Sequence, residues 1–321
     1  MHTTLDKNAQ ISTSSQVHIS ARFGDDFGSA DERARTRYRE FSALYDAQTV
    51  RHLTQRGIDK GWTCLEVGGG GGSIASWLCA RVGDQGGVLA TDIDTRFLSA
   101  LRFRNLGVRC HDIRTEGLPE HRFDLAHARL VLMHLSDREQ ALRRMVKAIK
   151  PGGWIVLEEF DDVSYLPNPT INPGEVSLKI RHAFQQVLTS KGVDLRYGRL
   201  LPQKLQEIGL VNIGAEASVS LWKSRSAGTR LLQVSCEDLR EPIIRSGLIS
   251  EEEFESDMKL VDERDFMMPS PMMWTVWGQA PEEKSISAPR LPIELPHAEA
   301  MLPTVLQAGD ERCEDLAPIG K

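Results

Sequence analysis

The sequence predicts an α/β fold in which buried strands alternate with amphipathic helices around a mostly parallel sheet. First, an apolar run over residues 63–67 is followed by five consecutive glycines at 68–72. Second, apolar residues recur at helical spacing after the glycines until Gly83, a residue type that favours helix ends. Third, two more strand-like runs follow, ending at Asp92 and at Asp112. Strands alternating with helical segments are typical of a parallel sheet covered by helices.

The glycine run is a strand-to-helix turn, which lets a ligand approach the backbone and points helix N–H groups toward it. A plain tight turn needs only one or two glycines, so five favour a ligand-binding loop. No register gives the G-x-G-x-x-G of a dinucleotide loop, because Ser73, Ile74 or Ala75 stands at the sixth position. No lysine follows to make a P-loop. The remaining pattern is an acid followed by alternate glycines: Glu66, Gly68, Gly70 and Gly72.

This pattern resembles the first motif of the class I S-adenosylmethionine-dependent methyltransferases. Asp92 lies about 20 residues beyond the glycines, where such folds place a ribose-binding carboxylate. A strand reaching Asp112 and Ile113, a fourth strand from Phe123, and a Pro-Gly-Gly turn at 151–153 before a fifth strand follow in the family's order. The resemblance covers residues 31–280, and its details look most like actinobacterial small-molecule methyltransferases.

The resemblance implies a Rossmann-like, seven-stranded, mostly parallel sheet with helices on both faces. It also implies an N-terminal helical lid and a helical insertion between the last two strands, which we expect at 211–221 and 273–278. The cofactor that the resemblance implies is S-adenosyl-L-methionine. In the family, the loop and its preceding acid face the methionine end, the second acid binds ribose and the third meets adenine. The implied cofactor-binding residues are Glu66, Gly68, Gly70, Gly72, Asp92, Ile93, Asp112, Ile113 and Arg129.

The expected organisation has a single methyltransferase domain between two tails. Within it, local patterns predict a helix around residues 97–101 that Asp94 caps and Gly107 ends, and capping boxes that begin at Ser136 and Ser250. The expected parts are a mobile tail (1–30), the domain (31–280) with its helical cap (31–60), cofactor-binding core (61–160) and helical insertion (225–268), and a flexible tail (281–321).

His134 is the leading candidate for a catalytic base, because it falls just past the fourth strand on the cofactor's methionine side. A general base suits a hydroxyl or amine acceptor. His111 and His127 read as structural residues. Glu158 and Glu159 end the fifth strand, at the sheet edge where ligands bind, so one of them is a candidate to face the substrate.

Net charge, cysteine spacing and hydropathy limit the classes of partner that the protein is expected to bind. The 321 residues carry a net charge of −6, which lacks the basic footprint of a nucleic-acid binder. The five cysteines show no paired spacing, a pattern of reduced cytoplasmic proteins without a disulfide frame or metal site. The sequence shows no apolar run of membrane-spanning length and no signal peptide. We therefore expect a small-molecule substrate, no nucleic acid, no membrane, and a possible homo-oligomer.

The favoured function is methyl transfer from S-adenosylmethionine to oxygen, nitrogen or carbon of a small molecule in specialised metabolism. The Asp-Pro-Pro-Tyr type of motif found in many base and amide N-methyltransferases is missing, since residues 128–131 read Ala-Arg-Leu-Val. Two alternatives stay open. One is a methyltransferase-like protein that binds the cofactor without turnover. The other is a nicotinamide-dependent oxidoreductase, which the failed dinucleotide register disfavours.

Overall fold

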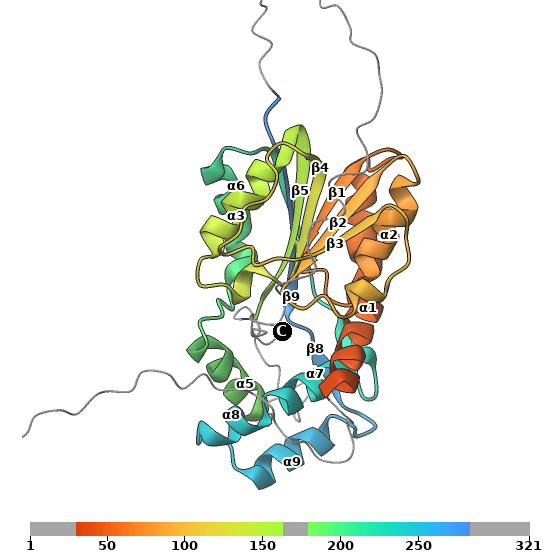
Figure 1. The fold of residues 1–321 in the computed structure, drawn as a ribbon. Coiled ribbons are helices and arrows are strands. Elements are labelled where there is room, and N and C mark those ends of the chain that lie inside the picture. Colours follow the sequence, from red (N-terminus) through yellow and green to blue (C-terminus); the bar gives the residue numbers. More distant parts are fainter. Residues whose placement is uncertain (1–29, 163–178, 283–321) are drawn as a thin grey trace, which may run out of the picture.

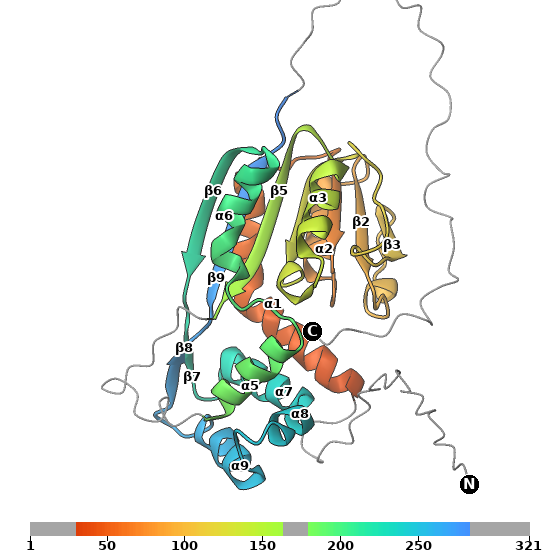
Figure 2. The ribbon, with the colours of Figure 1, turned by 90° about the vertical axis from the view of Figure 1, so that its left-hand side faces the viewer.

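The computed structural model describes residues 30–162 and 179–282 (Figures 1 and 2). The predicted tails lie almost entirely outside these ranges. The strands are β1 (Thr63–Val67), β2 (Gly87–Asp92), β3 (Leu106–Cys110), β4 (Phe123–Arg129), β5 (Ile149–Asp161), β6 (Val211–Ser218), β7 (Leu221–Lys223), β8 (Met267–Pro269) and β9 (Met272–Gln279). The helices are α1 (Ala30–Gln55), α2 (Ser73–Val82), α3 (Arg138–Ala148), α5 (Lys179–Ser190), α6 (Tyr197–Ile208), α7 (Ala227–Asp238), α8 (Arg240–Arg245) and α9 (Glu251–Leu260), with 3-10 turns at Leu98–Ala100 and Leu132–His134.

The main sheet has seven strands in the order β3-β2-β1-β4-β5-β9-β6, which confirms the predicted fold class. Strands β1 to β5 run parallel, whereas β9 is antiparallel to both of its neighbours. The strand order reverses between β1 and β4. In open α/β sheets, ligands bind beyond the carboxyl ends of the strands at such a reversal. The glycine loop follows β1 directly and therefore lies at this point.

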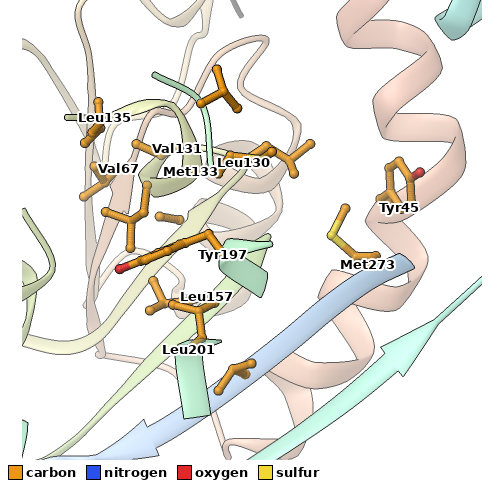
Figure 3. Packing of buried hydrophobic residues seen from close by; sticks show 14 of the residues in the cluster. Tyr45, Val67, Leu130, Val131, Met133, Leu135, Leu157, Tyr197, Leu201 and Met273 are labelled. Atoms are coloured by element: carbon orange, nitrogen blue, oxygen red, sulfur yellow. The ribbon is translucent and has the colours of Figure 1, made fainter. Parts of the chain in front are cut away.

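Helices cover both faces of the sheet (Figure 2). On one face, Leu53 of α1 and Leu78 of α2 pack against Leu125 and Val156 of the central strands. On the other face, α3 and α6 pack against the sheet. Figure 3 shows Tyr197 and Leu201 of α6 beside Leu157 of β5, with Tyr45 and Met273 separate from them near α1. Helices α5 and α7–α9 and the β7–β8 ribbon lie together beyond the carboxyl ends of the strands (Figures 1 and 2).

Two local predictions were wrong. Instead of a helix around residues 97–101 there is one short 3-10 turn, and Gly107 lies inside β3. The chain turns early because Leu98 is fully buried beneath the glycine loop, next to Gly69. The capping box at Ser136 does not form, since its hydroxyl donates to Asp137 instead. The second predicted capping box, at residues 250–253, is confirmed.

The outer strand β6 is shorter than predicted. Residues 219 and 220 separate it from β7, which pairs with β8 in a ribbon of its own. The pairing of β6 with β9 shifts register between Val211 and Gly214, and Asn212 there has φ of 50°. This irregularity is a β-bulge, which bends the edge strand and leaves a residue without a ladder partner.

Candidate functional site

A pocket opens at the carboxyl ends of β1, β2 and β3, against the segment that follows β4. Its walls are mainly apolar, with two carboxylates, two imidazoles and a guanidinium among them. Figure 3 shows Val67, Leu130, Val131 and Leu135 on this side of the sheet. The lining residues are Val67, Gly68, Asp92, Ile93, His111, Asp112, Ile113, Arg114, Leu130, Val131, His134 and Leu135.

The glycine loop is held by hydrogen bonds within the protein. The amides of Gly68 and Gly69 donate to the Thr91 carbonyl at 2.7 and 3.0 Å, and Gly70 donates to Asp92 Oδ2 at 2.8 Å. Alternate glycines at 68, 70 and 72 have positive φ, a conformation that disfavours other residues. The loop conformation therefore depends on the carboxylate that ends β2.

Contacts within the chain also require the glycines. A Cβ atom at Gly70 or Gly71 would lie 2.8 Å from the side chain of Tyr38, and one at Gly72 would lie 2.6 Å from Leu101. The first helix thus rests directly on the loop. The sequence analysis predicted a ligand-binding loop and did not foresee that the packing of α1 against the loop also requires these glycines.

Asp92 lines the pocket and organises its floor. Besides Gly70, its carboxylate accepts a hydrogen bond from the amide of Asp94 at 3.1 Å. Burial and the charge of Asp92 raise the pKa of the nearby Tyr38 hydroxyl to about 12. Ile93, the next residue, gives the pocket an apolar wall.

Asp112 lies in the same pocket but has a partner that the sequence analysis missed. The guanidinium of Arg114 binds its two oxygens at 2.7 to 3.0 Å, and these hydrogen bonds lower the pKa of Asp112. Ile113 lines the pocket between them. An arginine two residues after an acid is a visible sequence signal for such a pair. Any ligand that reaches the Asp112 carboxylate shares it with Arg114.

Two histidines also line the pocket. His111 holds the carbonyl of Gly117 through Nε2 at 3.3 Å, while its buried Nδ1 has no hydrogen-bond partner in the described ranges. Burial lowers the pKa of His111, which favours the neutral ring. His134 ends the 3-10 turn after β4, and its amide donates to the Val131 carbonyl at 3.1 Å. Its side chain is placed where the sequence analysis expected a base.

Four of the predicted cofactor residues do not line this pocket: Glu66, Gly70, Gly72 and Arg129. Arg129 instead binds α1, donating to Thr49 at 2.9 Å and to Asp46 at 2.9 Å. Glu66 turns toward β4, where its Oε2 lies 2.7 Å from Nδ1 of His127. Both side chains therefore face the sheet surface beneath α1.

A row of buried polar side chains crosses the sheet there, and we call it the polar row: Glu66, His127, Glu158, Thr275 and Thr49. Nε2 of His127 lies 3.4 Å from Glu158 Oε2, which also accepts the hydroxyl of Thr49. Thr275 donates to the other oxygen of Glu158 at 2.8 Å. The row thus runs from β1 through β4 and β5 to β9 and α1.

The charges in the polar row compensate one another. Burial alone would lower the pKa of His127, but the two flanking carboxylates raise it to about 9. Burial would raise the pKa of Glu158, but hydrogen bonds with His127 and Thr49 and the charge of Arg129 hold it below its usual range. His127 is therefore an imidazolium between two carboxylates at neutral pH.

The prediction that Glu158 or Glu159 faces a substrate was wrong for the described residues. Glu158 is 1% exposed and bonded within the polar row. Glu159 points to the opposite face, where its Oε1 accepts the amides of Val131 and Leu132 at 3.1 and 2.7 Å. It fixes the chain after β4 and so supports the pocket wall. Burial, which strand position alone did not reveal, decides both roles.

The pocket fits an adenosine-containing cofactor. Isoleucines at 93 and 113 offer apolar surfaces for a planar base, and the carboxylate of Asp92 suits vicinal hydroxyls. The unpartnered Nδ1 of His111 can receive a hydrogen bond that the protein does not supply. Within residues 30–162 and 179–282, no cluster of His, Cys, Asp or Glu could hold a metal ion. The helices of that part are too short or too polar to span a membrane.

Comparison with known proteins agrees with this geometry. The family model described as a methyltransferase domain matches residues 65–157. The C-methyltransferase UbiE of ubiquinone and menaquinone biosynthesis from Laribacter hongkongensis is 32% identical over 117 residues, which are 35% of this chain and 48% of that protein. Phosphoethanolamine N-methyltransferase 1 of Arabidopsis thaliana is 24% identical over 131 residues, 39% of this chain and 24% of that protein. The chain thus spans half or less of the length of these relatives.

Solved structures share the fold. The YcgJ protein of Bacillus subtilis superposes with a TM-score of 0.51 at 12% identity. The superposition covers 74% of this chain and 100% of that chain. Phosphoethanolamine N-methyltransferase 2 of Haemonchus contortus, in complex with S-adenosyl-L-methionine, gives 0.50 at 13% identity over 78% of this chain and 57% of that one.

The structure is an α/β fold with a pocket beyond the carboxyl ends of β1, β2 and β3. Residues 65–157 match the methyltransferase-domain family, and the class I members of that family use S-adenosylmethionine as the methyl donor. This confirms the predicted family and cofactor. The expected likeness to actinobacterial members stays a prediction.

Proposed function

We propose that this protein transfers a methyl group from S-adenosylmethionine to a small-molecule acceptor. The observation that carries the proposal is the placement of Asp92, which lines the pocket and at the same time holds the glycine loop. The adenosine part of the cofactor would lie between the isoleucines at 93 and 113, with its ribose at Asp92 and its adenine toward Asp112. The cofactor supplies an electrophilic methyl group on sulfur. What the chain's residues contribute is orientation and exclusion of water.

His134 is proposed as the group that accepts the acceptor's proton. It lines the pocket on the segment after β4, where the sequence analysis placed the methionine end of the cofactor. The acceptor would enter from the side of α5 and α7–α9, and the insertion at 225–268 would select it. The names of the relatives include a C-methyltransferase and an N-methyltransferase, so both kinds of acceptor atom belong in a screen. A cytoplasmic role in specialised metabolism is part of this proposal.

Calorimetry with S-adenosylhomocysteine tests the cofactor site. Asp92→Asn removes a charged acceptor for ribose hydroxyls and should raise Kd at least about tenfold. The amide oxygen of Asn can still accept the Gly70 amide, so the loop should keep its conformation. Asp94→Asn is the matched control, because Asp94 pairs with Arg96 and does not line the pocket.

Two outcomes would contradict the proposal: absent binding to the wild-type protein, or binding that Asp92→Asn leaves unchanged. Tighter binding of NADH than of S-adenosylhomocysteine would favour the oxidoreductase alternative. Turnover is then sought with labelled S-adenosylmethionine and a panel of small phenols, amines and quinones. Cofactor binding without any labelled product would favour the non-catalytic alternative.

A further inference from the structure

The polar row joins the first acid of the glycine motif to the N-terminal helix. Glu66 lies in β1, the strand that leads into the loop, and Thr49 lies on α1, with His127 and Glu158 between them. All four side chains are at least nine-tenths buried. The parallel register sets Glu66 directly beside His127 across β1 and β4. The link therefore follows from strand pairing and does not depend on mobile surface groups.

Only one oxygen of Glu66 is used in this link. Oε2 faces His127, while Oε1 has no hydrogen bond within the described part of the chain. The Cγ atom of Glu66 lies 3.5 Å from the position of a Cβ on Gly69, which places the side chain directly beneath the loop. Glu66 can thus present one oxygen toward the loop while the other stays fixed by the imidazolium.

The same helix is tied down at further points. Arg129, the next inward-facing residue of β4 after His127, binds Thr49 and Asp46. Near the other end of α1, Tyr38 rests on Gly70 and Gly71. The helix therefore contacts the glycine loop directly and also reaches it through the polar row.

From this arrangement we infer that His127 is a positioning residue, which fixes Glu66 toward the cofactor's amine and couples cofactor binding to the seating of α1. The inference rests on the proposed function, because it assigns Glu66 to that amine. Protonated His127 holds Glu66 and Glu158 close together without repulsion, and Glu158 in turn holds Thr49. Binding at the loop and docking of α1 then stabilise the same set of contacts.

The charged groups around His127 define its titration. Glu66 of β1 and Glu158 of β5 face its two ring nitrogens. Arg129 of β4 and His52 of α1 act on Glu158 from farther away. Thr49 and Thr275, from α1 and β9, contribute neutral hydroxyls. Loss of the His127 proton leaves two buried carboxylates beside a neutral ring, so Glu66 should lose its fixed position at alkaline pH.

The sharpest test uses a residue that touches neither the pocket nor Glu66. Thr49→Val removes the hydroxyl that binds Glu158 and nearly conserves volume. It should raise the Kd of S-adenosylhomocysteine roughly fivefold and speed hydrogen exchange in α1, measured by mass spectrometry. Thr54→Val on the same helix is the matched control, because the Thr54 hydroxyl binds only its own helix at Val50. It should change neither quantity.

A second variant tests His127 itself. His127→Gln keeps a hydrogen-bonding side chain without the charge and should weaken S-adenosylhomocysteine binding about tenfold. Wild-type affinity should fall as the pH rises through about 9, and the variant should lack this alkaline loss. His182→Gln, at an exposed position on α5, is the control. NMR of the His127 ring in the free protein should show an imidazolium at pH 8.

The outcomes separate the two proposals. A wild-type protein that does not bind S-adenosylhomocysteine overturns the proposed function and with it the coupling to cofactor binding. Hydrogen exchange in Thr49→Val and the ring titration then still decide whether the polar row holds α1 in place. If the cofactor product binds but Thr49→Val matches Thr54→Val in affinity and in exchange of α1, the coupling is overturned. A neutral His127 ring at pH 8 also overturns it.

Discussion

The pocket and the polar row contain the same kinds of side chain and use them differently. In the pocket, Asp92 and His134 line an open surface and combine backbone contacts with access to a ligand. In the polar row, Glu158 and His127 are buried, and both oxygens of Glu158 and both ring nitrogens of His127 have a partner. The two histidines are seven residues apart, so their difference comes from burial and partners. A histidine inside a strand is fixed by its neighbours, whereas one just past the strand end can meet a ligand.

The largest expected effect comes from breaking the polar row. Glu158→Ala leaves an imidazolium with one carboxylate and two hydroxyls without their acceptor, so it should lower the free energy of unfolding by about 3 to 5 kcal/mol. Urea denaturation measures this. Glu120→Ala is the control, because Glu120 forms a largely exposed ion pair with Lys147, and it should change stability by less than about 0.5 kcal/mol. Equal effects of the two variants would show that the row is not a buried charge network.

The pH dependence of stability also tests whether the polar row is a buried charge network. The folded protein raises the pKa of His127 to about 9, above the value of about 6.5 expected for the unfolded chain. The stabilisation is therefore complete below pH 6.5 and is lost as the pH rises through about 9. The loss should reach up to roughly 3 kcal/mol. Denaturation curves from pH 6 to 10 should show this slope in the wild type and not in His127→Gln.

Substitution of His134 tests whether a histidine in the pocket acts on the acceptor. If it removes the acceptor's proton, His134→Gln should lower kcat roughly a hundredfold, with little change in Tm or in affinity for S-adenosylhomocysteine. If it only supports the turn after β4, stability should fall by about 1 kcal/mol while turnover per folded molecule stays near normal. Measuring kcat and Tm on one sample separates these results, and the second one would contradict the proposed role.

The smallest expected effect lies outside both regions. Ser250 and Glu253 form a capping box at the start of α9, with bonds of 3.2 and 2.9 Å between side chains and backbone amides. Ser250→Ala should cost about 1 kcal/mol of stability, and Ser250→Thr should recover most of it. Neither variant should alter cofactor affinity. A large change in affinity would show that the helical insertion communicates with the pocket.

The cofactor half of the fold could be predicted because its signals are local. The glycine run and the strand-ending acids each depend on a few adjacent residues, and the observed strands follow in the expected order. The turn expected at 151–153 before the fifth strand was wrong, because these residues lie within β5, where its pairing with β4 shifts register. The helix expected near residue 98 failed because tertiary burial of Leu98 overrode local spacing. The short ribbon of β7 and β8 also escaped prediction, since its strands are only three residues long.

The site was predicted less completely, for a physical reason. Asp92, Asp112 and His134 follow from strand ends, which the sequence reveals. The partners of Glu66 and Glu158 depend on sheet register and on where α1 lies, and these are set by contacts between residues up to 117 positions apart. A weak signal did exist, because residues 125, 127 and 129 alternate onto one face of β4. A charged or polar residue at two of these positions indicates a polar layer beneath a covering helix.

The bulge in β6 has a consequence for how the molecule meets copies of itself. An outer strand exposes a row of unpaired backbone groups, to which another chain can add its own strand. Here the irregular register between Val211 and Gly214 bends that row, and Glu216 carries a charge that Arg51 pairs with at the surface. A straight incoming strand would find neither a flat ladder nor an uncharged border. The sheet is thereby protected against edge-to-edge aggregation on the side where its outermost strand is exposed.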